Sequence, residues 1–345
     1  MNLFKKTLSL TLALLMALSL TACGQKAEEP ASAEPPAQEE PVQEAPAEES
    51  VTTRIAALKG PTAMGLVKLM SDDPQSADGP LYDFTLAGAA DEVTPSLIKD
   101  DLDMACVPAN LASVLYNKTE GEIVTLAVNT LGVLYIVENG NAVTSMADLA
   151  GKTIVAAGKG STPEYALRYL LTQNGIDPDT DVVIDWKSEH AECVAALASG
   201  AATIALLPQP FVTVAQTKID GLRMALDLTK EWDALDNGSG MITGVIVARK
   251  TVVEENPAAV DAFVADYAES VAWVNENTAD AAQLIGDYGI VDAAVAEKAL
   301  PCCNIVCVTG SEMQTKLSGY LQVLFDAEPS SVGGALPGDD FCYGA

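Results

Sequence analysis

Short apolar runs rich in β-branched residues alternate with stretches of helical periodicity along most of the chain. The first pairs are "RIAALK" before "AMGLVKLM", "YDFTLAG" before "VTPSLIK", and "DMACVP" before "ANLASVLY". Two adjacent extended runs, "EIVTLAVNTL" and "GVLYIVEN", precede a second series that starts with "KTIVAAG" and "PEYALRYLLTQNG". Alternation of this kind predicts mostly parallel sheets covered by helices, which is an α/β fold.

The pattern becomes almost wholly helical after "MITGVIVARK", the last long strand-like run. Asn256 and Pro257 are residue types that cap and open a helix, and the apolar spacing behind them predicts a long helix to about Glu276. Further helices are predicted over 278–288 and 311–325.

This order predicts two lobes, the second inserted into the first. We expect residues 53–140 plus 249–345 to form lobe 1 and residues 141–248 to form lobe 2. About 290 residues are enough for two cores of ordinary domain size. Ligands of such open sheets bind where strands end and loops lead into helices.

The N-terminus has the pattern of an export signal. Lys5 and Lys6 precede an apolar run over 7–20 that is too short for a membrane span. "LTAC" then resembles a bacterial lipobox, so we expect residues 1–22 to be a signal peptide and Cys23 to be lipidated. The alternative is an ordinary signal peptide that contains a cysteine.

Residues 23–52 are dominated by Ala, Pro, Gln and Glu. Such a segment cannot bury enough apolar surface to offset its ordering entropy, so we expect a disordered tether. The globular part would then begin near Thr53, on the extracytoplasmic face of the cell membrane, and would contact the membrane through its lipid anchor only.

The formal net charge is -29, which repels nucleic acid and anionic lipid surfaces. We therefore expect no nucleic-acid partner. The cysteines after Cys23 are Cys106, Cys193, Cys302, Cys303, Cys307 and Cys342. Their pairing cannot be deduced from sequence. The cluster "CCNIVC" lacks a fourth ligand and a histidine, so we expect buried cysteines, or one disulfide, and no metal.

Two loops are the first candidates for holding a ligand. Gly60-Pro61-Thr62 and Gly160-Ser161-Thr162 each follow an apolar strand and precede a helix, where backbone N–H groups are free. We expect them to face each other across a cleft, and the alternative is that each is a plain helix cap. The full candidate set is Gly60, Pro61, Thr62, Asn110, Asn129, Thr130, Gly160, Ser161, Thr162 and Gln209.

Motifs for other chemistries are incomplete. "LAGKTIV" ends like a phosphate-binding loop but leads into a strand, and Pro163 occupies the place of the third glycine of a dinucleotide fingerprint. His190, the only histidine, lies at a predicted helix start, where we expect a solvated side chain. We therefore expect no catalytic residue, no cofactor and no enzyme, and the role of His190 stays open.

Several motifs in order carry a resemblance to one family. They are the lipobox, "LKGPTAMGLVKLM", "VPANLASVLYNKT", "LGVLYIVE", "DLAGKTI", "GSTPEYALRYLL", "LPQPFVT" and "GGALPGDDFCYG". Together they resemble the solute-binding lipoproteins of ATP-driven (ABC) importers, in the branch associated with nitrate, sulfonate, taurine and the pyrimidine precursor of thiamine.

The resemblance implies the type II periplasmic-binding fold, a two-lobe clamshell. It also implies capture of a solute by hinge closure. The backbone N–H groups and neutral side chains of the candidate loops suit a small polar organic solute, neutral or anionic, heteroaromatic or sulfonate-like, and we expect a monomer. The partners would be an ABC permease and its ATPase. Gln209 departs from the family pattern, since an acidic residue is expected between the prolines of "LPQPF". A receptor subunit for sensing, or an enzyme on the same scaffold, is the alternative.

Overall fold

The computed structural model describes residues 52–76 and 79–345, and within them a six-stranded and a five-stranded sheet. The larger sheet has the order β13 (Ile305–Val308), β6 (Ile123–Leu131), β12 (Ile242–Arg249), β5 (Met104–Pro108), β1 (Thr53–Leu58) and β4 (Tyr82–Ala87). The smaller sheet has the order β11 (Arg223–Asp227), β7 (Leu134–Glu138), β10 (Ile204–Pro208), β8 (Thr153–Ala157) and β9 (Val183–Lys187). A short hairpin pairs β2 (Gln75–Ser76) with β3 (Gly79–Pro80).

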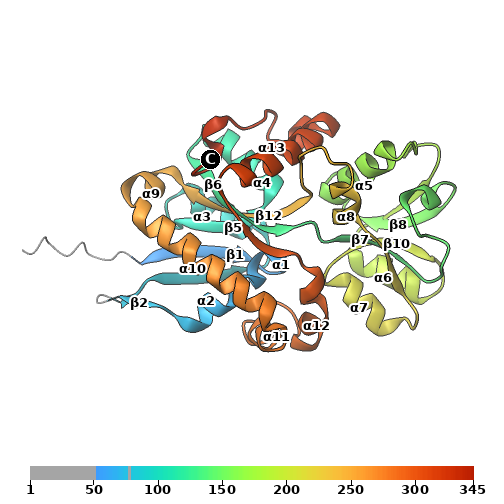
Figure 1. Cartoon of the computed structure of the whole chain (residues 1–345), viewed down its shortest axis with the longest axis horizontal. Helices are drawn as coiled ribbons and strands as arrows, with labels where there is room; N and C mark the ends of the chain where they lie inside the picture. Colours follow the sequence, from blue (N-terminus) through green and yellow to red (C-terminus); the bar gives the residue numbers. More distant parts are fainter. Residues whose placement is uncertain (1–51, 77–78) are drawn as a thin grey trace, which may run out of the picture. The chain divides into compact units, whose positions relative to one another are not determined.

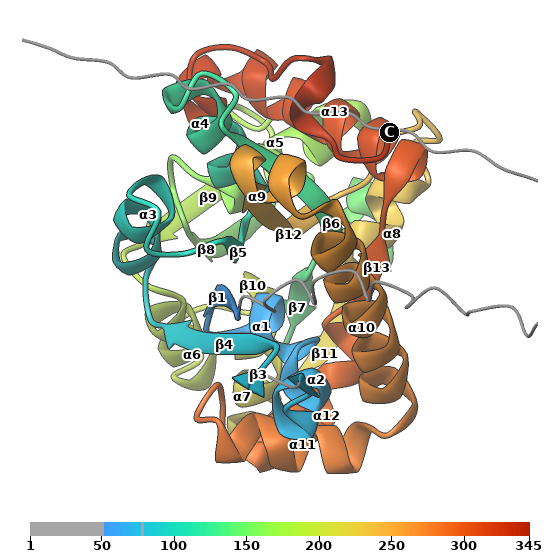
Figure 2. The same cartoon turned by 90° about the vertical axis from the view of Figure 1, so that its left-hand side faces the viewer.

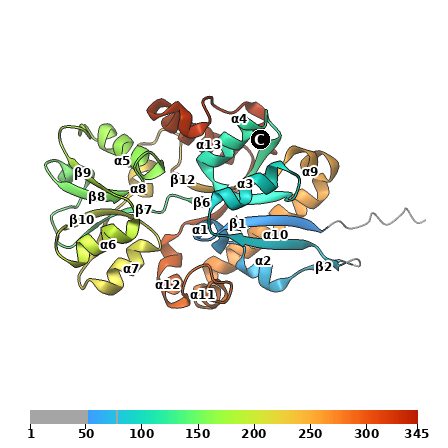
Figure 3. The ribbon, with the colours of Figure 1, turned by 180° about the vertical axis from the view of Figure 1, so that it is seen from behind.

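Helices cover both faces of each sheet (Figures 1 and 3). Those around the six-stranded sheet are α1 (Pro61–Met64), α2 (Val67–Asp72), α3 (Ala90–Ile98), α4 (Ala109–Lys118), α9 (Lys250–Glu255), α10 (Pro257–Glu276), α11 (Thr278–Asp287), α12 (Ala293–Ala299) and α13 (Gly310–Ala327). Those around the five-stranded sheet are α5 (Thr162–Gln173), α6 (His190–Ala198), α7 (Phe211–Lys218) and α8 (Leu228–Asp233). Single 3₁₀ turns are η1 (Met146–Leu149), η2 (Leu300–Cys302), η3 (Pro329–Val332) and η4 (Asp339–Phe341).

Alternation of side chains along the strands separates the core into layers. Ile55, Met104 and Ile246 face the layer that also contains Phe263 and Tyr267 of α10. The intervening strand residues face α3, α4 and α13 on the other side, as expected for a period of two. Figure 2 shows α10 running along the side of the sheet opposite α4. The predicted long helix after Asn256 is confirmed, and the Asn256 side chain accepts a hydrogen bond from Ala259 N.

The α/β fold class is confirmed, but both sheets are mixed. β4, β1 and β5 pair in parallel, and so do β10, β8 and β9. β12 pairs antiparallel with β5 and β6, and β7 pairs antiparallel with β10 and β11. These two strands reach their sheets directly from the other half of the chain rather than through a covering helix, which is why their direction reverses.

Strand pairing also bears on the lobe boundaries expected at residues 140 and 248. β7 belongs to the five-stranded sheet although it precedes residue 141, and β12 belongs to the six-stranded sheet although it begins at Ile242. We therefore propose that the chain crosses between the lobes at 132–133 and at 234–241.

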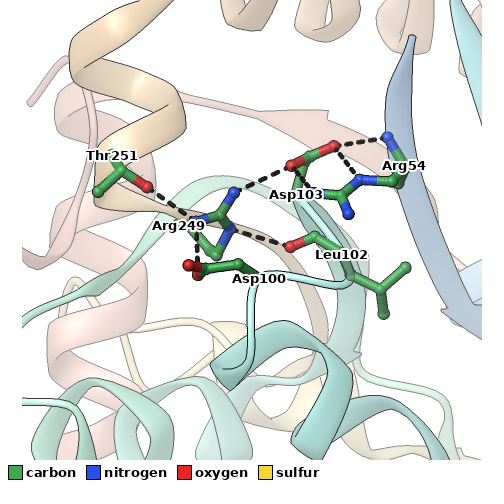
Figure 4. Close-up of polar contacts among 6 residues, drawn as sticks. All are labelled: Arg54, Asp100, Leu102, Asp103, Arg249 and Thr251. Carbon is green, nitrogen blue, oxygen red and sulfur yellow. Dashed lines mark hydrogen bonds and ion pairs between the residues drawn. The ribbon is translucent and has the colours of Figure 1, made fainter.

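An ionic network joins three strands of the six-stranded sheet (Figure 4). The Asp103 carboxylate accepts hydrogen bonds from Arg54 N (2.9 Å), Arg54 Nε (3.0 Å) and Arg249 (3.1 Å). Arg249 also donates to Leu102 O (3.0 Å) and to Asp100 (2.6 Å). Burial alone would raise the pKa of Asp103, but the hydrogen bonds from the two arginines outweigh it and hold the pKa below its usual value.

The predicted signal peptide, Cys23 and all of the predicted tether except Thr52 lie outside the described residues. Within residues 52–76 and 79–345, no helix has the length and apolar character needed to cross a bilayer.

Candidate ligand-binding site

A cavity of about 300 Å³ lies at the ends of strands from both sheets. Its lining residues are Thr62, Pro108, Asn110, Val133, Leu134, Ser161, Thr162, Pro163, His190, Pro208, Met241, Ile242, Thr243 and Tyr320. β5 and β10 end at the lining residues Pro108 and Pro208, and β1, β8 and β9 lead by short loops to helices that carry others. The position agrees with the rule that ligands of open α/β sheets bind beyond the carboxyl ends of the strands.

Residues from both predicted loops line this cavity. Thr62 lies in α1, and its hydroxyl donates to Leu58 O at 2.9 Å. Ser161 and Thr162 are the N-cap and first residue of α5, and the Ser161 hydroxyl donates to Gly158 O at 2.7 Å. Asn110, in the first turn of α4, also lines the cavity.

Asn110 is fixed from outside the cavity. Its Nδ2 donates to Ser331 O at 3.2 Å, and Ser331 is not among the lining residues. The segment around η3 thereby holds the first turn of α4, because Ser113 donates to Val332 O at 2.7 Å in the same region.

The other candidates do not line the cavity, and two of them act beneath it. Asn129 and Thr130 are fully buried in β6. Asn129 Nδ2 donates to Thr62 O at 3.2 Å, and the Thr130 hydroxyl donates to Asn129 Oδ1 at 3.0 Å. These side chains position Thr62 rather than face a ligand. Gly60, with φ +126°, is the N-cap of α1, and Pro61 is its first residue.

Gly160 and Gln209 are likewise outside the lining. Gly160 adopts φ +75° and its N–H donates to Glu164 Oε2 at 2.7 Å, so the glycine forms the turn and the following residues form the wall. Gln209 is 3% exposed, and its Oε1 accepts from the Thr213 hydroxyl at 3.0 Å. Its amide oxygen therefore caps α7 instead of meeting a solute.

Sequence reasoning missed Tyr320 of α13. This side chain is fully buried at the cavity wall, and its hydroxyl makes no hydrogen bond of good geometry with the described residues. Burial raises the pKa of Tyr320, and the nearby Thr162 side chain opposes this in part. A buried hydroxyl without a hydrogen bond costs folding free energy unless a molecule in the cavity bonds to it.

His190 was expected to be solvated, and the structure corrects this. It is the first residue of α6, as predicted, but it is half-buried in the cavity wall with its ring centroid 5.2 Å from that of Phe211. Its Nδ1 is buried without a partner among the described residues. Burial lowers the pKa of His190, so the neutral ring is favoured.

The electrostatics of the cavity come from backbone and neutral side chains. No Lys, Arg, Asp or Glu is among the lining residues. The N-terminal ends of α4, α5 and α6 reach the lining through Asn110, Thr162 and His190. Each such end carries free N–H groups and about half a positive charge. Apolar side chains complete the wall, among them Val133, Leu134 and Ile242.

The cysteines give no sign of a metal centre. Cys303 is buried and Cys302 and Cys307 are half-buried, and burial raises the pKa of Cys303 to about 12 and that of Cys307 to about 11. In the part of the chain that the structure describes, all six cysteines are free thiols and no group of three or more His, Cys, Asp or Glu is arranged to hold a metal ion.

Solved structures share this fold. A protein from Parabacteroides distasonis described as an ABC transporter is 22% identical, with 84% of this chain and 98% of that chain covered and a TM-score of 0.71. The periplasmic aliphatic sulphonate-binding protein SsuA from Escherichia coli is 18% identical, with 85% and 92% covered and a TM-score of 0.66. The alkanesulfonate-binding protein SsuA from Xanthomonas axonopodis pv. citri, bound to MOPS, is 17% identical, with 86% and 97% covered and a TM-score of 0.58.

No curated protein matches the chain. A family model does, over residues 82–299, and its description is "ABC transporter, phosphonate, periplasmic substrate-binding protein". Members of such a family bind a small solute outside the cytoplasm for an ABC permease and are not enzymes, so the resemblance found in the sequence is confirmed. Because the match spans more than half of the chain, this protein belongs to the periplasmic phosphonate-type substrate-binding family of ABC transporters.

Proposed function

We propose that the cavity binds a small organic oxyanion of the phosphonate or sulfonate type with a short apolar body. The observation that carries this proposal is one cavity that combines three helix N-termini, an apolar wall and no charged lining side chain. The family description and the sulfonate ligands of proteins with the same fold support the same class of solute.

Helix N-termini supply the positive potential that an anion needs. Each contributes backbone N–H donors, and in a partly enclosed site these donors are pre-oriented and cost no reorganisation. The buried hydroxyl of Tyr320 and the half-buried imidazole of His190 add polar groups that make no hydrogen bond of good geometry with the described residues. An oxyanion head group placed between them would form hydrogen bonds with several of these groups at once.

Solutes that carry an ammonium group fit less well. An ammonium taken out of water needs a carboxylate or several acceptors, and no carboxylate lines the cavity. Gln209, where an acidic residue was expected from the family pattern, is neutral and occupied by Thr213. We therefore expect simple alkyl oxyanions to bind better than their amino derivatives.

The size of the cavity limits the apolar body. Liquid water takes about 30 Å³ per molecule, so 300 Å³ holds a solute of about ten non-hydrogen atoms. A head group of four or five such atoms leaves room for a short alkyl chain against Val133, Leu134 and Ile242.

Three features of the sequence complete the proposal. We infer that Cys23 carries a lipid that anchors the protein, that residues 24–52 form the tether, and that the protein acts as a monomer whose lobes close on the solute. Closure would bring Thr62 and Asn110 toward Ser161 and Thr162, since these pairs come from different sheets.

The test is isothermal titration calorimetry of the purified protein with methylphosphonate, methanesulfonate, an aminoalkyl phosphonate and a neutral sugar. We expect binding of at least one simple oxyanion and weaker binding of the amine and the sugar. A charge-insertion pair sharpens the result. Thr243→Glu places a carboxylate in the cavity and should weaken oxyanion binding at least a hundredfold, whereas Thr217→Glu adds the same charge at an exposed position of α7 and should change binding less than twofold. Equal binding by both variants would contradict the location of the site.

A further inference from the structure

A second groove, of about 1120 Å³, has walls from both lobes. One wall consists of α5, the loop before it and β9, which belong to lobe 2, and the other is the C-terminal end of α13, which belongs to lobe 1. On the basis of the lobe closure proposed above, we infer that this groove narrows when the lobes close and that Glu328 then binds Lys159 and Tyr165. We call these three residues the latch, and none of them lines the solute cavity.

The lobe 2 wall has one cation without a partner. Arg168 pairs with Asp179 at 2.8 Å, and Glu164 accepts a hydrogen bond from Gly160 N at 2.7 Å. Lys159 is exposed and forms no ion pair with the residues that the structure describes. A free acidic partner for this ammonium group must therefore come from the other wall.

The lobe 1 wall carries two carboxylates and no cation. Asp326 accepts from Gln322 Nε2 at 2.7 Å, one turn back along α13. Glu328 follows α13, and its Oε1 accepts from Ser330 N at 3.2 Å and from the Ser330 hydroxyl at 2.8 Å. These bonds lower the pKa of Glu328, so the side chain is ionised at neutral pH. Its Oε2 accepts no hydrogen bond from the described residues and is available to a partner across the groove.

Tyr165 of α5 lies near Glu328 in the groove. Its side chain is half-buried, and its hydroxyl makes no hydrogen bond with the described residues. Burial raises the pKa of Tyr165, and the negative charges of Glu328 and Glu164 raise it further. Because charges act strongly only over short distances in water, the hydroxyl and the Glu328 carboxylate are near neighbours across the two lobes. A small approach of the lobes is enough to form a hydrogen bond between them.

Lobe closure moves the latch residues toward each other. Glu328 is the N-cap of η3, and η3 is bonded to the first turn of α4 through Asn110 and Ser113. Ser161 is the N-cap of α5 and lies two residues after Lys159. A motion that brings Ser161 toward Asn110 therefore carries Lys159 toward Glu328.

The latch should act on solute release rather than on solute capture, because it forms only after the lobes have closed. Exposed ion pairs and hydrogen bonds contribute little each, so the expected changes are a few fold. The test is calorimetry and stopped-flow release of methylphosphonate. Lys159→Glu and Glu328→Lys should each weaken binding about threefold through faster release, and the double variant Lys159→Glu/Glu328→Lys should return to within about twofold of the wild type.

The sign of the Glu328→Lys effect separates the latch from long-range electrostatics. The substitution replaces a negative charge with a positive one, so long-range attraction alone would tighten the binding of an anion. The latch predicts weaker binding, because two ammonium groups then face each other across the groove. Glu255→Lys in α9 is the matched control, since Glu255 is exposed and outside the groove, and it should not weaken binding. Binding by Glu328→Lys that is unchanged or tighter would overturn the inference.

A cysteine pair tests the approach of the lobes without any solute. A disulfide needs Cα atoms within about 7 Å, so it reports direct contact. Lys159→Cys/Glu328→Cys should form a disulfide at least tenfold faster under mild oxidation than Lys159→Cys/Glu120→Cys, with the parent protein as the control for its own thiols. Glu120 is also an exposed residue of lobe 1, but it follows the far end of α4. Equal rates for the two pairs would overturn the inference.

The two experiments also separate the latch from the proposed function. If the wild-type protein binds methylphosphonate but the double charge exchange does not rescue affinity, the latch fails while the function stands. If the wild-type protein binds no oxyanion, the proposed function fails, and the disulfide rates of the ligand-free protein alone decide whether the latch exists.

Discussion

The two ends of each sheet differ in whether their buried polar groups are paired. At the end away from the cavity, Asp103 binds two arginines and Glu138 binds Arg223 together with Ala142 N (2.9 Å) and Val143 N (3.1 Å). At the cavity end no lining residue is charged, and Tyr320 and His190 keep polar atoms that make no hydrogen bond of good geometry with the described residues.

The difference separates stability from binding. A carboxylate as buried as Asp103 or Glu138 is tolerated only when paired, and a pair that links separate strands then holds those strands in register. At the cavity end, under the function proposed above, a bound solute would satisfy polar groups that the ligand-free protein leaves unsatisfied. Substitutions at the far end should therefore change unfolding free energy, and substitutions at the cavity end should change affinity.

The largest effect is expected for Asp103→Ala. Removing this carboxylate leaves Arg54 N without its acceptor and takes a buried acceptor from the half-buried Arg249, which should destabilise the protein by about 2–4 kcal/mol in denaturant unfolding. Asp100→Ala removes a carboxylate from the same arginine, but its side chain is 71% exposed, so the loss should stay below about 1 kcal/mol. Similar losses in both variants would show that burial is not what matters.

The same residue predicts a pH dependence. Because the pKa of Asp103 is below its usual value in the folded state, its contribution is complete above the unfolded pKa and disappears as pH falls through the folded value. Wild-type stability should therefore fall with acidification below about pH 4, and the slope should be smaller in Asp103→Ala.

The next largest effect is expected for Gly244→Ala, which should lower both the unfolding free energy and the affinity for the solute. A Cβ on Gly244 in β12 would collide with the side chain of Thr62 and lie 2.5 Å from Asn129 Oδ1. Overpacking of this kind should cost about 1–3 kcal/mol and, by shifting Thr62, weaken binding of the solute. Gly240→Ala is the control, because its Cβ would meet only Lys316, at an ordinary 3.6 Å. An unchanged affinity in Gly244→Ala would show that Thr62 does not shape the site.

Part of this contrast was predictable from sequence. Thr62, Asn110, Ser161 and Thr162 line the cavity because each follows a strand and opens a helix, and that arrangement is visible in the local pattern. The apolar alternation likewise predicted the helix-covered sheets. It carries no information on strand direction, so the antiparallel pairing of β7 and β12 was missed.

The rest depends on long-range packing. Tyr320 reaches the cavity because α13 packs on α5 and α8, where its ring lies 5.6 Å from that of Trp232. No local signal marks that contact. Asn129 has the residue type of a ligand site, but its Nδ2 donates to Thr62 O, which is distant in sequence. Gln209 also has such a residue type, but its Oε1 accepts from Thr213 in the helix that follows it. The sequence shows which side chains can form hydrogen bonds, and only the fold shows which of them are already bonded within the protein.

Tyr320→Phe tests the cavity end of the sheets, where we expect a change in affinity without a loss of stability. The hydroxyl has no partner of good geometry among the described residues, so its removal should leave ligand-free stability unchanged or slightly higher. It should weaken solute binding about fivefold, the value of one hydrogen bond. Tyr267→Phe is the control, since that hydroxyl is buried in the core against Asn129 O and Val306 O. Calorimetry and thermal unfolding of both variants would contradict the comparison if the Tyr320 variant lost stability and kept its affinity.

The smallest effect concerns His190. Burial lowers its pKa in the folded state, so below the unfolded pKa the unfolded chain takes up a proton that the folded chain resists. Ligand-free stability should therefore fall gently as pH decreases through the usual histidine range, and the fall should level off below the folded pKa. The chain has one histidine, which makes the assignment unusually direct. Denaturant unfolding between pH 7.5 and pH 5.5 should show this slope in the wild type and lose most of it in His190→Gln. A slope that persists in His190→Gln would mean that other groups cause it and that burial does not lower the pKa of His190.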